Sequence, residues 1–73
     1  MSKGGERVTY TVKQARMLAE KTQVEMAAAM NISRETYMKI EKTPGRATIT
    51  QARLISQITG IPLDNIFFGP DST

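Results

Sequence analysis

Four polar side chains with complementary hydrogen-bonding groups lie in one short stretch of the sequence, Arg34, Glu35, Thr36 and Lys39. The planar guanidinium of Arg34 can donate two parallel hydrogen bonds to a guanine edge, and Lys39 can also donate to guanine. Glu35 can accept from a cytosine amino group, and the methyl group of Thr36 can contact a thymine methyl group. These residues therefore predict readout of DNA base edges, provided that one element presents all four to solvent.

Each of the four residues, taken alone, is better explained as a solvated surface side chain. Glu35 has two further explanations, because it could orient Arg34 or Lys39, or stabilise the start of a helix through its negative charge. The functional interpretation depends on the four occurring together on one helix face.

Two short helices joined by a tight turn are predicted for residues 22–30 and 33–41. Thr22 begins the first helix with a capping box, in which its hydroxyl accepts from a backbone amide three residues later. Ser33 can cap the second helix in the same way. Asn31 lies between them and tolerates the left-handed backbone of a sharp reversal. The second helix would then carry the four polar side chains.

Apolar residues at helical spacing lie behind this polar face. Met26 and Met30 are four residues apart on the first helix, and Tyr37 and Ile40 are three apart on the second. Residues at these spacings share one helix face. Ala27 is small, as the closest crossing of the two helices requires. The pattern predicts a helix-turn-helix with an apolar inner side and a polar outer side.

This stretch resembles the Cro/C1-type helix-turn-helix family, which includes lambdoid phage repressors and Cro proteins. The matching residues are Thr22-Gln23, Ala27, Ile32-Ser33 and Ile40-Glu41. The similarity extends over about residues 11–68. Lys21 and Asn31 depart from the family pattern, which usually has an apolar residue and a glycine at these positions. The resemblance implies an all-α, lambda-repressor-like DNA-binding domain.

Five helices are expected in all, at about residues 11–20, 22–30, 33–41, 48–59 and 62–67. Thr11 and Thr48 each begin a T-x-x-Q capping box, Gly60 suits a helix end, and Pro62 suits a helix start. Residues 8–10 alternate like a strand but are too few to assign. Several apolar residues of the flanking helices are expected to face the core, including Leu18, Ile49, Leu63 and Phe67.

The chain of 73 residues is long enough for one domain with a small core. We assign the domain to residues 10–68, with a flexible tail at 1–9 and a second tail at 69–73. The sequence contains no cysteine and no histidine, so neither a disulfide framework nor a common zinc site is expected. No cofactor or small-molecule ligand is indicated.

The net charge of +3 favours polyanionic partners only moderately. No apolar run approaches the roughly 20 residues of a membrane span, and the start of the chain lacks the apolar region of a signal peptide. We expect a cytoplasmic protein of a bacterial cell or a phage-infected host.

Phosphate contacts are expected from the start of the first helix of the motif and from the residues that follow its second helix. Gln23 lies at the start of the first helix, where exposed backbone amides and the helix dipole favour an anion. The other candidates follow the second helix and are Lys42, Thr43, Arg46 and Thr48. The family resemblance further implies an ion pair between Arg16 and Glu41; alternatively, both are ordinary solvated charges.

One such helix reads only a few base pairs, so a two-fold dimer on a near-palindromic site is expected. Relatives dimerise through the region of the last helix. The apolar candidates for this interface are Leu54, Ile58, Ile61 and Phe68. The alternative is that some of them only complete a small core.

The sequence thus predicts a DNA-binding transcriptional regulator, a repressor or Cro-like protein of phage or prophage type. The alternative is a protein-interaction module, such as an antitoxin that binds its partner through the apolar carboxy-terminal surface. An enzyme is not expected, because Glu35, Glu41 and Asp64 form no recognisable acid–base pair.

Overall fold

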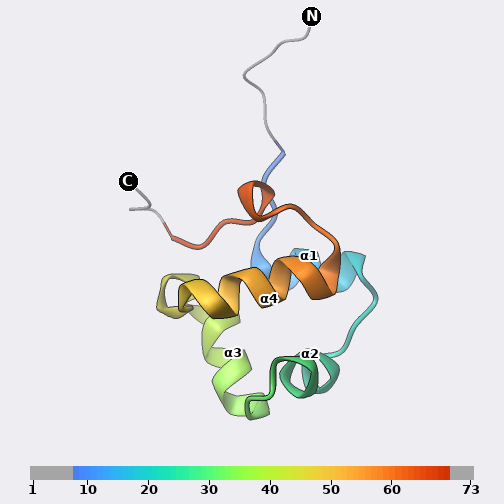
Figure 1. The fold of residues 1–73 in the computed structure, drawn as a ribbon, viewed down its shortest axis with the longest axis vertical. Helices are drawn as coiled ribbons and strands as arrows, with labels where there is room; N and C mark the ends of the chain where they lie inside the picture. The colour runs from blue at the N-terminus through green and yellow to red at the C-terminus, as the bar shows by residue number, and fades with distance from the viewer. Residues whose placement is uncertain (1–7, 70–73) are drawn as a thin grey trace, which may run out of the picture.

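The computed structural model of the protein describes residues 8–69; residues 1–7 and 70–73, with most of the two expected tails, lie outside the described residues. The elements in chain order are α1 (Val12–Leu18), α2 (Gln23–Met30), α3 (Arg34–Lys42), the 3-10 turn η1 (Pro44–Arg46), α4 (Ile49–Thr59) and the 3-10 turn η2 (Leu63–Asn65). Helices α2 and α3 form one end of the molecule, and α4 crosses between this end and the η2 segment (Figure 1).

The predicted capping residues begin all four α-helices. Thr11, Thr22 and Thr48 each form a complete capping box, and the Ser33 hydroxyl accepts a hydrogen bond from the Thr36 amide at 3.1 Å. Because a cap residue is itself extended, each α-helix begins one residue after its cap. The helical starts predicted from these motifs are confirmed on this basis.

Left-handed residues reverse the chain between elements. Asn31 has a φ of 61° between α2 and α3, and Gly60 has a φ of 76° after α4. Both positions are occupied by residue types that tolerate this conformation. Glu20 has a φ of 59° between α1 and α2, a third reversal that no sequence motif had indicated.

The core lies where all four helices meet. Its fully buried side chains include Val12, Met26, Tyr37 and Ile55, one from each helix. The inner face predicted for the helix-turn-helix is confirmed, because Ala27, Met30 and Ile40 are buried with Met26 and Tyr37. Packing of α2 against α3 thus fixes which side of α3 remains outside.

Two residues expected in the core face solvent instead. Leu18 is 57% exposed and Ile49 is 72% exposed. A helix turns about 100° per residue, so each lies about 120° around its helix from a buried residue, Val12 or Ile55. The buried face of each helix is narrower than the apolar spacing predicted, and Leu18 and Ile49 lie beyond its edge.

The prediction of a fifth helix at residues 62–67 is wrong, because this segment contains only the single 3-10 turn η2. After this turn Ile66 is extended and forms a parallel bridge with Tyr10. The Tyr10 amide donates to the Asn65 carbonyl, and the Phe67 amide donates to the Tyr10 carbonyl, both at 2.8 Å. Ile66 is buried, whereas Leu63 and Phe67 remain 39% and 42% exposed. Pairing with the start of the described chain therefore replaces the helix.

The segment after η2 also reaches the loop that follows α3. A Cβ atom at Gly45 would lie 3.4 Å from the backbone carbonyl oxygen of Phe68. The carboxy-terminal segment and the loop after α3 therefore lie close together.

Candidate nucleic-acid interface

Helix α3 presents all four candidate base-reading side chains to solvent. Its inner face is formed by Tyr37 and Ile40, which are buried. The exposed residues of its outer face include Arg34, Glu35, Thr36 and Lys39. The arrangement therefore meets the geometric condition for a reading helix, which is a polar face held outward by an apolar inner side.

Thr36 and Glu35 differ in the hydrogen bonds that their side chains form. The Ser33 hydroxyl donates to the Thr36 hydroxyl oxygen at 2.8 Å, which leaves the methyl group and the hydroxyl hydrogen of Thr36 available. Glu35 forms no side-chain hydrogen bond or ion pair within residues 8–69. In this structure Glu35 therefore does not orient Arg34 or Lys39.

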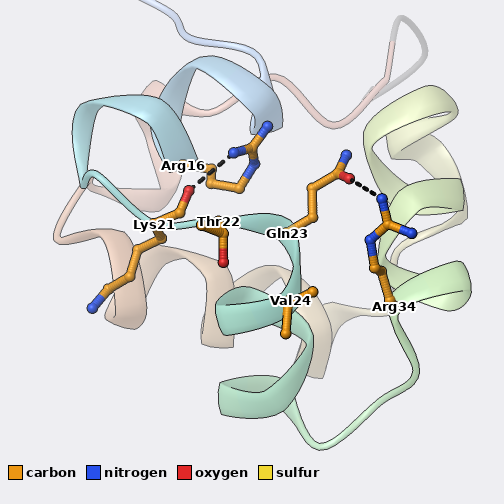
Figure 2. A pocket seen from close by; sticks show the side chains of 6 residues that line it. All are labelled: Arg16, Lys21, Thr22, Gln23, Val24 and Arg34. Atoms are coloured by element: carbon orange, nitrogen blue, oxygen red, sulfur yellow. Dashed lines mark hydrogen bonds between the residues drawn. The ribbon is translucent and has the colours of Figure 1, made fainter.

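A hollow lies between the amino-terminal ends of α2 and α3 (Figure 2), and we call it the amino-terminal hollow. It is lined by Arg16, Lys21, Thr22, Gln23, Val24 and Arg34. A guanidinium nitrogen of Arg34 donates to the Gln23 amide oxygen at 3.4 Å. Arg16 donates to the backbone carbonyl of Lys21 at 2.9 Å. Basic side chains therefore surround the start of α2, where free backbone amides also favour an anion.

A second hollow lies at the other end of α3, and we call it the carboxy-terminal hollow. It is lined by Lys39, Lys42, Thr43 and Arg46. Three of the four residues are cationic, and all four are exposed. The structure thus places the predicted base-reading residue Lys39 beside the predicted phosphate-binding residues. Thr48 is not part of this lining; its hydroxyl accepts the Gln51 amide at 3.0 Å as a helix cap.

The two hollows flank the outer face of α3. At a rise of 1.5 Å per residue, Arg34 and Lys42 are separated by about 12 Å along the helix axis. A polar helix face with a basic hollow at each end is suited to contact bases in the middle and phosphates at both sides.

Glu41 holds the first three helices together beneath this surface. Its carboxylate accepts hydrogen bonds from Arg16 Nε and the Tyr37 hydroxyl, both at 2.6 Å, and from Gln23 Nε2 at 3.1 Å. The side chains of Arg16 and Glu41 are only 13% and 8% exposed. The pair implied by the family resemblance is thus present as a nearly buried ion pair with two further donors.

These contacts shift the titration of the three groups. Burial raises the pKa of the Glu41 carboxyl, but the hydrogen bonds from Arg16, Tyr37 and Gln23 outweigh burial, so this pKa lies below its ordinary value. The hydrogen bond to Glu41 raises the pKa of the Arg16 guanidinium. Burial, followed by the hydrogen bond to Glu41, raises the pKa of the Tyr37 hydroxyl. The ionised carboxylate is therefore the form that stabilises the fold.

A pH dependence of stability follows from the depressed pKa of Glu41. The stabilisation is fully present above the ordinary carboxyl pKa of 4.5 and is lost as the pH falls through the lower pKa of the folded state. We expect the unfolding free energy from urea titrations to decline as the pH falls below the ordinary carboxyl pKa, and to decline less in Glu41→Gln. Parallel pH profiles for the two proteins would contradict this expectation.

Sequence reasoning missed two members of the Glu41 cluster. Tyr37 was expected only as an apolar core residue, although it lies four residues before Glu41, a spacing that brings side chains together on a helix. Gln23 was expected only as a phosphate contact. No local spacing connects Gln23 with Glu41, because the two residues come from different helices.

The candidate dimer residues lie at the edge of the core. All four are partly buried and pack against the core cluster, namely Leu54, Ile58, Ile61 and Phe68.

Among residues 8–69, no group of three or more carboxylates is placed to hold a metal ion. None of the helices described is both long and apolar enough to cross a bilayer.

Comparison with known families agrees with this geometry. The model of the family described as "Helix-turn-helix" matches residues 12–66, which include all four α-helices and η2. Searches of curated proteins and of solved structures found no significant match. The family is one of DNA-binding transcription regulators. The chain belongs to the Cro/C1-type helix-turn-helix family.

Proposed function

We propose that the protein regulates transcription by binding a specific double-stranded DNA sequence, with α3 in the major groove. The observation that carries this proposal is the outer face of α3, where Arg34, Glu35, Thr36 and Lys39 are exposed between two basic hollows. Such a face combines groups that distinguish base pairs with groups that bind phosphates. The family resemblance favours a repressor or Cro-like regulator of phage or prophage type.

Different residues would supply affinity and sequence choice. Arg34 and Thr36 lie on the early turns of α3, so we assign them to base edges, together with Glu35. Lys42, Thr43 and Arg46 are assigned to phosphates of one strand. Gln23 and the first amides of α2 are assigned to phosphates beside the amino-terminal hollow, while Lys39 lies where it can reach a base or a phosphate. Thr48 is a weaker phosphate candidate, because its hydroxyl oxygen already caps α4.

We further propose that two copies bind together on a near-palindromic operator, since one helix reads too few base pairs for useful specificity. The proposed contact region is the one that contains Leu54, Ile58, Ile61 and Phe68. These residues retain partial exposure, and Leu63 and Phe67 are exposed close by in the chain. A two-fold axis there would set two α3 helices about 34 Å apart on one side of the DNA.

Selection of bound sites from random duplex DNA, at a stated salt concentration, tests the proposal. We expect enrichment of one sequence motif made of two related half-sites about one helical turn apart. Enrichment of a single half-site would contradict the dimer but not the DNA-binding function. Recovery of unselected sequences would contradict sequence-specific regulation.

The cationic side chains of the carboxy-terminal hollow lead to a separate prediction about the salt dependence of DNA binding. Lys42→Ala and Arg46→Ala should each weaken binding to all sequences alike, because each removes a phosphate contact. Each should also reduce the slope of log affinity against log salt concentration by about one. Fluorescence anisotropy over a salt series measures this slope. Arg53→Ala is the matched control, because Arg53 is exposed on α4 and lines neither hollow; a slope reduced equally by the control would contradict the assignment.

A further inference from the structure

One large apolar side chain is exposed on the outer side of helix α3. Of the large apolar residues that are exposed within residues 8–69, only Met38 belongs to α3, and its exposed fraction is 37%. Within the same residues, Met38 belongs neither to the buried core cluster nor to the apolar residues that pack against it. The hydrophobic core therefore does not account for a methionine at this position.

The helical register places Met38 on the side of α3 that faces away from the core. At about 100° per residue, Met38 lies about 100° around the helix from Tyr37 and about 160° from Ile40, the two buried residues of α3. Arg34 and Lys42 lie four residues before and after Met38, so the three side chains share one stripe of the helix surface. Met38 thus lies between a proposed base contact and a proposed phosphate contact.

The thymine methyl group is the one apolar group that base pairs present in the major groove. The side chains of Arg34 and Lys42 end in charged groups, whereas Met38 ends in a flexible thioether that adapts to irregular apolar surfaces. Thr36 also carries a methyl group, but it lies about 160° from Met38 around α3. Met38 and Thr36 would therefore contact different base pairs.

We propose that Met38 is a further specificity-determining residue, which selects one A·T base pair by packing its side chain against the thymine methyl group. This inference rests on the proposed function and deepens it, because it adds an apolar contact to the polar contacts assigned above. The Met38 side chain is uncharged and neutralises no phosphate, so this contact adds nothing to the salt dependence of binding.

Replacement of single thymines by uracil in the selected operator tests the proposal, because uracil differs from thymine only in lacking the methyl group. For the wild-type protein, uracil at one position of a half-site should weaken binding about fourfold, the effect of one buried carbon group. Met38→Ala should bind the thymine and uracil operators equally at that position, and its salt slope should equal that of the wild type. Met38→Leu keeps an apolar side chain and should retain part of the difference between thymine and uracil.

Thr36→Ser is the matched control, because it removes a methyl group from the opposite side of α3 and keeps the hydroxyl group. It should leave the difference between thymine and uracil at the Met38 position unchanged. The proposal is overturned if uracil at every thymine position leaves wild-type binding unchanged, or if Met38→Ala retains the full difference. Failure of site selection to yield any motif would instead contradict the proposed function, and this inference with it.

Discussion

Glu41→Ala should lower the free energy of unfolding by about 2–4 kcal/mol. The change removes three hydrogen bonds at once, from Arg16, Tyr37 and Gln23. It also leaves the Arg16 guanidinium without its partner, although the Arg16 side chain is only 13% exposed. A nearly buried cation without a counter-charge is more costly than an exposed one.

Urea denaturation followed by circular dichroism measures this effect, and the melting temperature should fall by roughly 10 °C or more for a domain of this size. Glu35→Ala is the matched control, because it removes the same charge from the exposed face of α3. A surface change of this kind should alter the free energy by less than about 0.5 kcal/mol. Equal losses in the two variants would show that charge, rather than the Glu41 cluster, accounts for the effect.

Arg34→Ala should weaken operator binding by about 1–3 kcal/mol and relax the preference at a single base pair. Arg34 is exposed at the start of α3, and its guanidinium can donate two hydrogen bonds to guanine. Loss of this fork leaves the guanine acceptors without protein partners, so the correct base loses more affinity than an incorrect one. The fold should be unaffected, because the only partner of Arg34 within residues 8–69 is the Gln23 side chain.

Binding to a panel of operators with one base pair changed at a time distinguishes this effect from a phosphate contact. In the wild-type protein one position should show a strong preference that Arg34→Ala removes. Lys42→Ala provides the comparison, because it should lower all affinities without changing their order. If Arg34→Ala preserves the order of the whole panel, Arg34 contacts the DNA backbone and the base-reading assignment is wrong.

Most of the fold that could be predicted from the sequence was predicted from local motifs. The Thr-x-x-Glu and Thr-x-x-Gln boxes at Thr11, Thr22 and Thr48 place their partners within one turn, so three helical starts could be predicted from the sequence. The cap residue Ser33 predicted the fourth. Asn31 and Gly60 likewise have left-handed conformations that their residue types favour. These features depend on interactions between residues that are neighbours in sequence.

Features that depend on distant segments could not be read in this way. Pro62 and the apolar residues after it suggested a helix, but the backbone of Ile66 pairs with Tyr10, more than fifty residues earlier. The Glu41 cluster was only partly predicted: family resemblance implied Arg16 as a partner, whereas nothing local connected Gln23 with Glu41. The exposure of Leu18 and Ile49 was missed because apolar spacing does not show how wide the buried face of each helix is.

The closeness of Gly45 to the backbone carbonyl of Phe68 has a consequence for any assembly of two copies. The loop that begins with Pro44 carries Arg46 into the carboxy-terminal hollow, and its Gly45 lies close to Phe68, which belongs to the proposed subunit contact. If pairing of two copies restrains Phe68, we expect it to restrain also the loop that carries the proposed phosphate contact Arg46. Subunit association and DNA affinity would then be thermodynamically linked, and each would strengthen the other by the same factor.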